Sequence, residues 1–140
     1  MIDKIKEKML KYKEIINYLI FGLLTTIVNF TIYFIFANFF KLDELVSNCI
    51  AWFISILFAY ITNKLIVFES KPKKKTIILK QITLFVASRL LSGLICDIII
   101  FGFMIKVLKI NDIIVKVITQ IIVIVLNYLS SKLVIFKKIN

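Results

Sequence analysis

Four long runs of apolar residues, separated by short charged connections, dominate the sequence. Each run has more than 20 residues and at most two charged side chains. An α-helix needs about 20 mostly apolar residues to cross roughly 30 Å of hydrocarbon, so each run is long enough to span a membrane. The runs cover residues 15–40, 45–68, 81–105 and 113–136.

The abundance of Ile and Val also raises the possibility of β-strands. A strand of a membrane barrel has about ten residues of alternating polarity, whereas these runs are about twice as long and do not alternate. With 61% hydrophobic residues and a mean hydropathy of +0.98, the chain is predicted to be an all-α integral membrane protein of four transmembrane helices.

The net charge of +11 does not indicate nucleic-acid binding, because the cations lie at the ends of the apolar runs. Fourteen basic residues lie in the N-terminal arm, the connection between the second and third runs, and the C-terminus, against four in the other two connections. By the positive-inside rule, we expect both termini in the cytoplasm.

Residues 1–14 are expected to form an amphipathic cytoplasmic arm ahead of the four-helix transmembrane domain of residues 15–140. In this arm Ile2, Ile5, Met9 and Leu10 alternate with lysines at helical spacing. Such a helix can bind the anionic inner leaflet, so membrane lipid is one expected partner.

One nine-residue segment occurs twice, at residues 60–68 and 128–136. Four of the nine positions are identical, and the spacing is 68. Chance similarity between apolar segments is the alternative. The repeat predicts two helical hairpins of parallel orientation, with their symmetry axis along the membrane normal.

Polar residues recur on one face of each run. Small and hydroxyl residues of this kind allow close helix packing, but four such stripes together also indicate a polar seam inside the bundle. Both interpretations stay open. The candidate polar-seam residues are Thr25, Asn29, Tyr60, Asn63, Ser92, Asp97, Asn127 and Tyr128.

Three cations within the runs are candidates for binding phosphate. A charge such as Arg89 at a helix centre costs about 2.5–3.5 kcal/mol on insertion scales, so it has either a structural partner or an anionic ligand. Lys64 and Lys132 occupy matching repeat positions near the cytoplasmic ends; they either snorkel to the surface or bind lipid phosphate. Tyr60 and Tyr128, one turn earlier, can stack on a sugar or belong to an interfacial aromatic belt.

Nothing in the sequence indicates an enzyme. The chain has no histidine, its two cysteines are far apart, and its three glycines are too widely spaced for a phosphate-binding loop. Asp97 has no second carboxylate to act with it in acid–base chemistry. We therefore expect no catalytic residue, metal site or cofactor.

Together, segments 18–29, 63–68, 85–97 and 127–136 resemble GtrA-like membrane proteins over nearly the whole chain. The resemblance implies that the chain flips a polyprenyl-phosphate-linked monosaccharide across the bacterial cytoplasmic membrane for cell-surface polysaccharide or teichoic acid glycosylation, with a membrane glycosyltransferase as partner. The family usually has arginine where this chain has Lys64 and Lys132, so the charge is kept without bidentate geometry.

Two other functions are weighed against this flippase. One is a scaffold or accessory subunit that recruits a glycosyltransferase. The other is a small multidrug-type exporter, which is disfavoured because residues 15–40 contain no carboxylate. A chain of 140 residues has little room to enclose a path, so an open groove or a homo-oligomer is expected.

Overall fold

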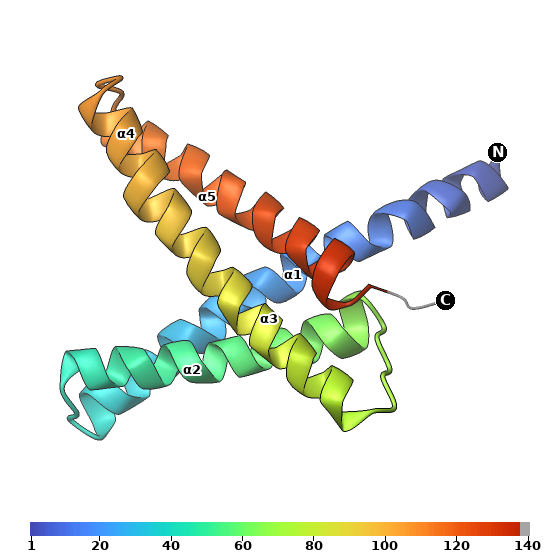
Figure 1. The fold of residues 1–140 in the computed structure, drawn as a ribbon, viewed down its shortest axis with the longest axis horizontal. Coiled ribbons are helices and arrows are strands. Elements are labelled where there is room, and N and C mark those ends of the chain that lie inside the picture. The colour runs from blue at the N-terminus through green and yellow to red at the C-terminus, as the bar shows by residue number, and fades with distance from the viewer. Residues whose placement is uncertain (138–140) are drawn as a thin grey trace. The chain divides into compact units, whose positions relative to one another are not determined.

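The structure, a computed structural model, describes residues 1–137, without the side chains of Asp97, Phe101 and Asp112. Every regular element of this described part is helical (Figure 1), which confirms the predicted all-α fold. The chain divides into two compact units, Met1–Lys71 and Pro72–Asn140. Four helices are long and apolar enough to cross a membrane: Ile2–Phe39, Glu44–Val67, Lys75–Lys106 and Ile113–Ile135.

The first unit is a hairpin of two antiparallel helices (Figure 1). Its second helix starts at a side-chain cap, because Asp43 accepts a 2.9 Å hydrogen bond from the backbone N–H of Leu45. Each helix ends in a π-helical turn, labelled η. The elements are α1 (Ile2–Phe34), η1 (Ile35–Phe39), α2 (Glu44–Thr62) and η2 (Asn63–Val67).

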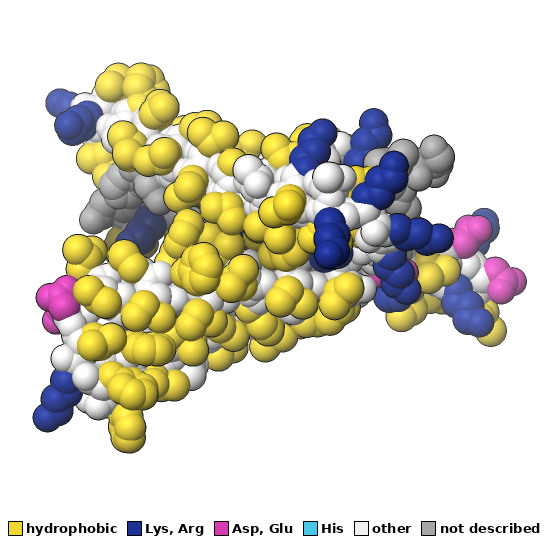
Figure 2. Space-filling model, turned by 60° about the horizontal axis from the view of Figure 1, so that its bottom comes forward, with side chains coloured by type: hydrophobic (Ala, Val, Ile, Leu, Met, Phe, Trp, Pro, Cys, Tyr) yellow, Lys and Arg dark blue, Asp and Glu magenta, His cyan; other side chains and the backbone are white. Residues whose placement is uncertain are grey.

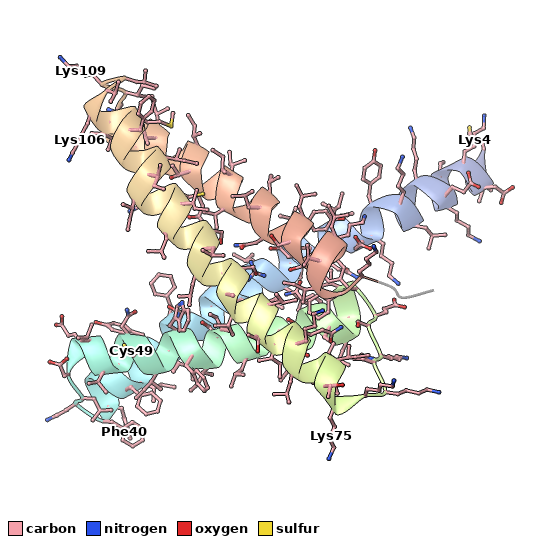
Figure 3. The ribbon with its side chains drawn as sticks, in the orientation of Figure 1. Lys4, Phe40, Cys49, Lys75, Lys106 and Lys109 are labelled. Carbon is pink, nitrogen blue, oxygen red and sulfur yellow. The ribbon has the colours of Figure 1, made fainter. Side chains whose placement is uncertain are left out.

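The second unit is also an antiparallel hairpin, but a seven-residue π-helical segment interrupts its first helix. The side chain of Asn111 caps the return helix by accepting a 2.9 Å hydrogen bond from the N–H of Ile113. Lys106 and Lys109 lie at the hairpin end in Figure 3. The elements are α3 (Lys75–Gly93), η3 (Leu94–Ile100), α4 (Phe101–Lys106), α5 (Asp112–Ser130) and η4 (Ser131–Ile135).

The repeat found in the sequence has the same local structure in each unit. α2 and η2 become α5 and η4 when their bounds are shifted by 68 residues. The residues two positions before the caps, Lys41 and Lys109, both have positive φ, at 52° and 50°. The repeat therefore includes the cap and the π-helical end, while the relative orientation of the two hairpins stays a prediction.

The N-terminal arm is helical, but no break separates it from the first span. α1 is one continuous helix from Ile2 to Phe34, and its first turns, where Lys4 lies, extend past the end of α2 (Figures 1 and 3). The expected boundary at residue 14 is therefore not visible as an end or a turn of the helix.

On the face shown in Figure 2, apolar side chains cover most of the helix surface and lysines gather toward the helix ends. Several fully or nearly fully buried side chains are instead small and polar, among them Ser47, Ser55, Thr119 and Ser131. This distribution suits a lipid environment, where large apolar groups gain little by being buried and small residues let helices approach closely.

Candidate functional site

Arg89 lies near the middle of the candidate span Lys75–Lys106, with its side chain half-buried. Its guanidinium carbon is 4.6 Å from the ring centroid of Phe85, one turn earlier on α3. Phe85 is fully buried and contacts Phe136, with the ring centroids 6.1 Å apart. The cation is thus held against a fixed aromatic ring, an arrangement that favours a partly desolvated guanidinium.

Two contacts define the register of the second hairpin. Near the end of η4, Phe85 contacts Phe136; further along, the hydroxyl of Ser92 donates a 2.7 Å hydrogen bond to the Oδ1 atom of Asn127. Because the helices are antiparallel, Arg89 lies level with Ser131 and Lys132 between these contacts. Two cationic side chains therefore occur at about the same depth in one hairpin.

Each repeat carries a lysine and a tyrosine one turn apart. Lys132 Nζ donates a 3.1 Å hydrogen bond to the hydroxyl of Tyr128 and is 5.5 Å from its ring centroid. Lys64 Nζ is 5.7 Å from the ring centroid of Tyr60. Lys132 is exposed, Lys64 is half-buried and Tyr60 is buried. The structure thus brings together the lysine and tyrosine that the sequence placed at each repeat end.

The first residue of each repeat's π-helical turn carries a buried polar atom without a hydrogen-bond partner in the described part of the chain. In η2 the Nδ2 atom of Asn63 donates to the carbonyl of Ala59 at 2.7 Å, but its Oδ1 atom is unpaired. In η4 the unpaired atom is the hydroxyl oxygen of Ser131. A buried polar group without a partner typically costs about 1–3 kcal/mol, so both positions favour a hydrogen-bonding ligand or neighbour.

In the first unit, a different polar contact joins the two helices. Asn29 Nδ2 donates a 3.3 Å hydrogen bond to the hydroxyl of Ser55, and Tyr18 contacts Phe68 with the ring centroids 6.5 Å apart. The register set by these contacts places Gly22 level with Asn63 and Lys64. At the position in the first hairpin that is equivalent to that of Arg89 in the second, the residue is therefore a glycine.

Of the remaining candidates, Thr25 has its side-chain hydrogen bond within its own helix. Its hydroxyl donates to the carbonyl of Phe21 at 2.7 Å. Asp97 lies in η3, and its side chain falls outside the described residues. Phe85 was not among the predicted site residues, although its spacing four residues before Arg89 is the signal that could have identified it.

One further feature of the described residues, a surface depression, has no assigned role. A shallow depression of about 330 Å³ on α5 is lined by Lys116, Val117, Gln120 and Ile121. It is mostly apolar and open to the surroundings. Among the described side chains, no group of three or more His, Cys, Asp or Glu residues is arranged to hold a metal ion.

The hydrogen bond between Ser92 and Asn127 offers a test of the hairpin register. Replacing Ser92 by Ala is expected to destabilise the protein by about 0.6 kcal/mol, the average for hydrogen bonds between membrane helices, and by no more than about 1.7 kcal/mol. Asn127→Leu should add little in the Ser92→Ala background, as a double-mutant cycle of unfolding in detergent would measure. Additive losses would show that the two side chains do not interact. Thr83→Ala is the matched control, because Thr83 is exposed and bonds only within its own helix.

These features define a class: a multi-pass membrane protein of four spanning helices, with small and polar residues between the helices. The chain belongs to the GtrA/DPMS transmembrane domain family, whose model matches residues 17–136. This confirms the resemblance that the sequence motifs indicated. No solved structure matches the chain.

The curated relatives cover nearly the whole chain. The cell wall teichoic acid glycosylation protein GtcA of Listeria monocytogenes serovar 1/2a is 38% identical over 97% of this chain and 93% of its own length. GtcA of Listeria innocua is 34% identical over 98% and 94%. The membrane protein YwcD of Bacillus subtilis, which is uncharacterized, is 36% identical over 86% and 94%.

Proposed function

We propose that this chain translocates a polyprenyl-phosphate-linked monosaccharide across the bacterial cytoplasmic membrane, as a step in teichoic acid or other cell-surface polysaccharide glycosylation. The names of the Listeria relatives support the glycosylation role. The observation that carries the translocation mechanism is the half-buried Arg89, held on Phe85 inside a candidate span and level with Lys132.

The chemistry of such a substrate fits this arrangement. Its polyprenyl tail can stay in lipid throughout, whereas its phosphate and sugar must cross the hydrocarbon. Arg89, half-buried about one turn inside the end of the hairpin, compensates the phosphate charge where partial desolvation strengthens the attraction. Lys132, level with Arg89 in the same hairpin, provides a second cation for the phosphate, and Lys64 offers a further cation in the other repeat.

Polar groups in the two hairpins lower the barrier to the sugar. The unpaired Oδ1 of Asn63 can accept a hydrogen bond from a sugar hydroxyl. Tyr60 and Tyr128 present aromatic rings for stacking near the two lysines. Thr25, Asn29, Ser92, Asp97 and Asn127 complete the proposed polar seam.

The proposed orientation places both termini and the connection between the two units in the cytoplasm. A membrane glycosyltransferase supplies the lipid-linked sugar on the cytoplasmic side, and glycosylation on the opposite side uses it. The chain moves its substrate without a covalent change, so it acts as a transporter and not as an enzyme. The direction of transport follows the gradient of the substrate or of an ion.

Cells in which Arg89→Ala replaces the natural chain distinguish a transporter from a scaffold. We expect the variant to accumulate and to co-purify with the glycosyltransferase as the unchanged chain does, while sugar attachment at the cell surface falls by at least about tenfold, the effect of losing roughly 1.4 kcal/mol. Normal sugar attachment with Arg89→Ala would instead favour a scaffold. Lys106→Ala, a cation at the opposite end of the same hairpin, is the control that should retain sugar delivery.

A further inference from the structure

The face of α1 that points away from α2 carries an apolar stripe with coiled-coil spacing. Ile2, Ile5, Met9, Tyr12 and Ile16 follow one another at alternating intervals of three and four residues. All five are exposed, by 50–71%. The opposite face of α1 carries Tyr18 and Asn29, whose partners belong to the same hairpin. The stripe thus has no partner within its own hairpin.

The length of the helix and its N-terminal lysines indicate that the N-terminal part of this stripe extends beyond the hydrocarbon. The helical segment Ile2–Phe39 has 38 residues, or roughly 57 Å at 1.5 Å per residue, which exceeds the roughly 30 Å of a bilayer core. Because α1 continues unbroken through residue 14, its first turns extend along the axis of the span. Lying flat on the membrane would require a sharp bend there.

The charged residues that flank the stripe indicate which kind of partner helix it would bind. In a heptad with Ile2 and Met9 at position a, the flanking e and g positions carry Lys6, Lys8 and Lys13. A second copy in the same membrane orientation could pair only in parallel, which would bring Lys8 of one copy against Lys13 of the other. Like charges at e and g disfavour pairing with a second copy. A partner helix with acidic residues at e and g is favoured instead.

We propose that the exposed stripe of α1 is a docking surface for a partner protein, which contributes a parallel helix with apolar residues at a and d and acidic residues at e and g. Apolar contacts along the stripe provide the affinity, and the lysines select the partner by charge. The proposal does not rest on the transport mechanism, since it uses none of the proposed substrate-binding residues.

A designed probe helix tests this directly. The probe is a single-span peptide with two extramembrane heptads that carry Leu at a and d, Glu at e and g, and one Cys at an a position. It is reconstituted in nanodiscs with the full chain carrying Cys49→Ser and Met9→Cys. Disulfide formation with the Glu probe should exceed that with a Lys probe by about tenfold, equivalent to roughly 1.4 kcal/mol.

Two variants make the test specific. Lys6→Glu together with Lys8→Glu should reverse the preference to the Lys probe; Lys13 stays unchanged because Glu69 is only 3.9 Å from it. Glu7→Cys, on the opposite face of the arm, should cross-link poorly with either probe. Equal cross-linking at residues 7 and 9, or no charge preference, would overturn the proposal.

The other candidate occupant is the membrane itself. A polarity-sensitive dye on Met9→Cys, in vesicles of 30% phosphatidylglycerol without any probe, should report a water-exposed site. A strong blue shift that disappears in Lys6→Glu, Lys8→Glu would show that the stripe binds anionic lipid, and the proposal would be wrong.

Discussion

Replacing Arg89 by Gln is expected to weaken binding of a polyprenyl-phosphate sugar by about 10- to 150-fold, while the protein stays folded. A hydrogen bond to a charged group contributes about 1.5–3 kcal/mol, which corresponds to this range of dissociation constants. Binding of a fluorescent polyprenyl-phosphate sugar to the purified chain in nanodiscs measures the effect. Arg89→Lys keeps the charge but loses the planar guanidinium, so it should bind with intermediate affinity.

Matched variants separate this site from general electrostatic attraction. Lys106→Gln removes one positive charge at the far hairpin end (Figure 3) and should leave the affinity nearly unchanged. Lys132→Gln should weaken binding more than Lys64→Gln, because Lys132 lies level with Arg89 whereas Gly22 occupies the corresponding depth beside Lys64. Unchanged affinity in Arg89→Gln would remove Arg89 from the binding site.

Phe85→Ala is expected to have the largest effect on stability among single substitutions in the second unit. Phe85 is fully buried and contacts both Phe136 and Arg89. Such a change costs about 3–5 kcal/mol in soluble cores. We expect about 2 kcal/mol here, because lipid solvates the unfolded side chain nearly as well as the protein interior does.

Unfolding of the purified protein in detergent measures this loss. Phe103→Ala is the control, since Phe103 is 55% exposed on α4 of the same unit and its removal should cost little. If Phe85→Ala were no more destabilising than Phe103→Ala, Phe85 would not be the packing centre of this hairpin or the support of Arg89.

Helices that are defined by a continuous apolar run could be predicted from the sequence. Apolar runs at 45–68 and 113–136 closely match α2–η2 and α5–η4, because a spanning helix satisfies its backbone hydrogen bonds within itself. The lysine and tyrosine of each repeat were also found from sequence, since a separation of four residues places both side chains on one helix face.

Features that depend on contacts between helices could not be predicted in this way. The pairs Ser92–Asn127 and Asn29–Ser55 follow from the register of each hairpin, and an apolar run does not specify that register. The π-helical ends have ordinary helical composition, so the sequence gives no signal for them. The change from charged to apolar composition near residue 14 does not show whether the helix is interrupted there, because both segments favour helix; in the structure α1 is continuous, and the division into arm and transmembrane domain stays a prediction.

Transbilayer movement of a polyprenyl-phosphate sugar in liposomes that contain only this protein tests the central claim most directly. The unchanged chain should accelerate movement of a fluorescent substrate well above protein-free liposomes, and Arg89→Gln, reconstituted in equal amount and shown to be folded, should not. If folded wild-type protein gave no acceleration, or if Arg89→Gln moved the substrate equally well, the proposed transport mechanism would be contradicted.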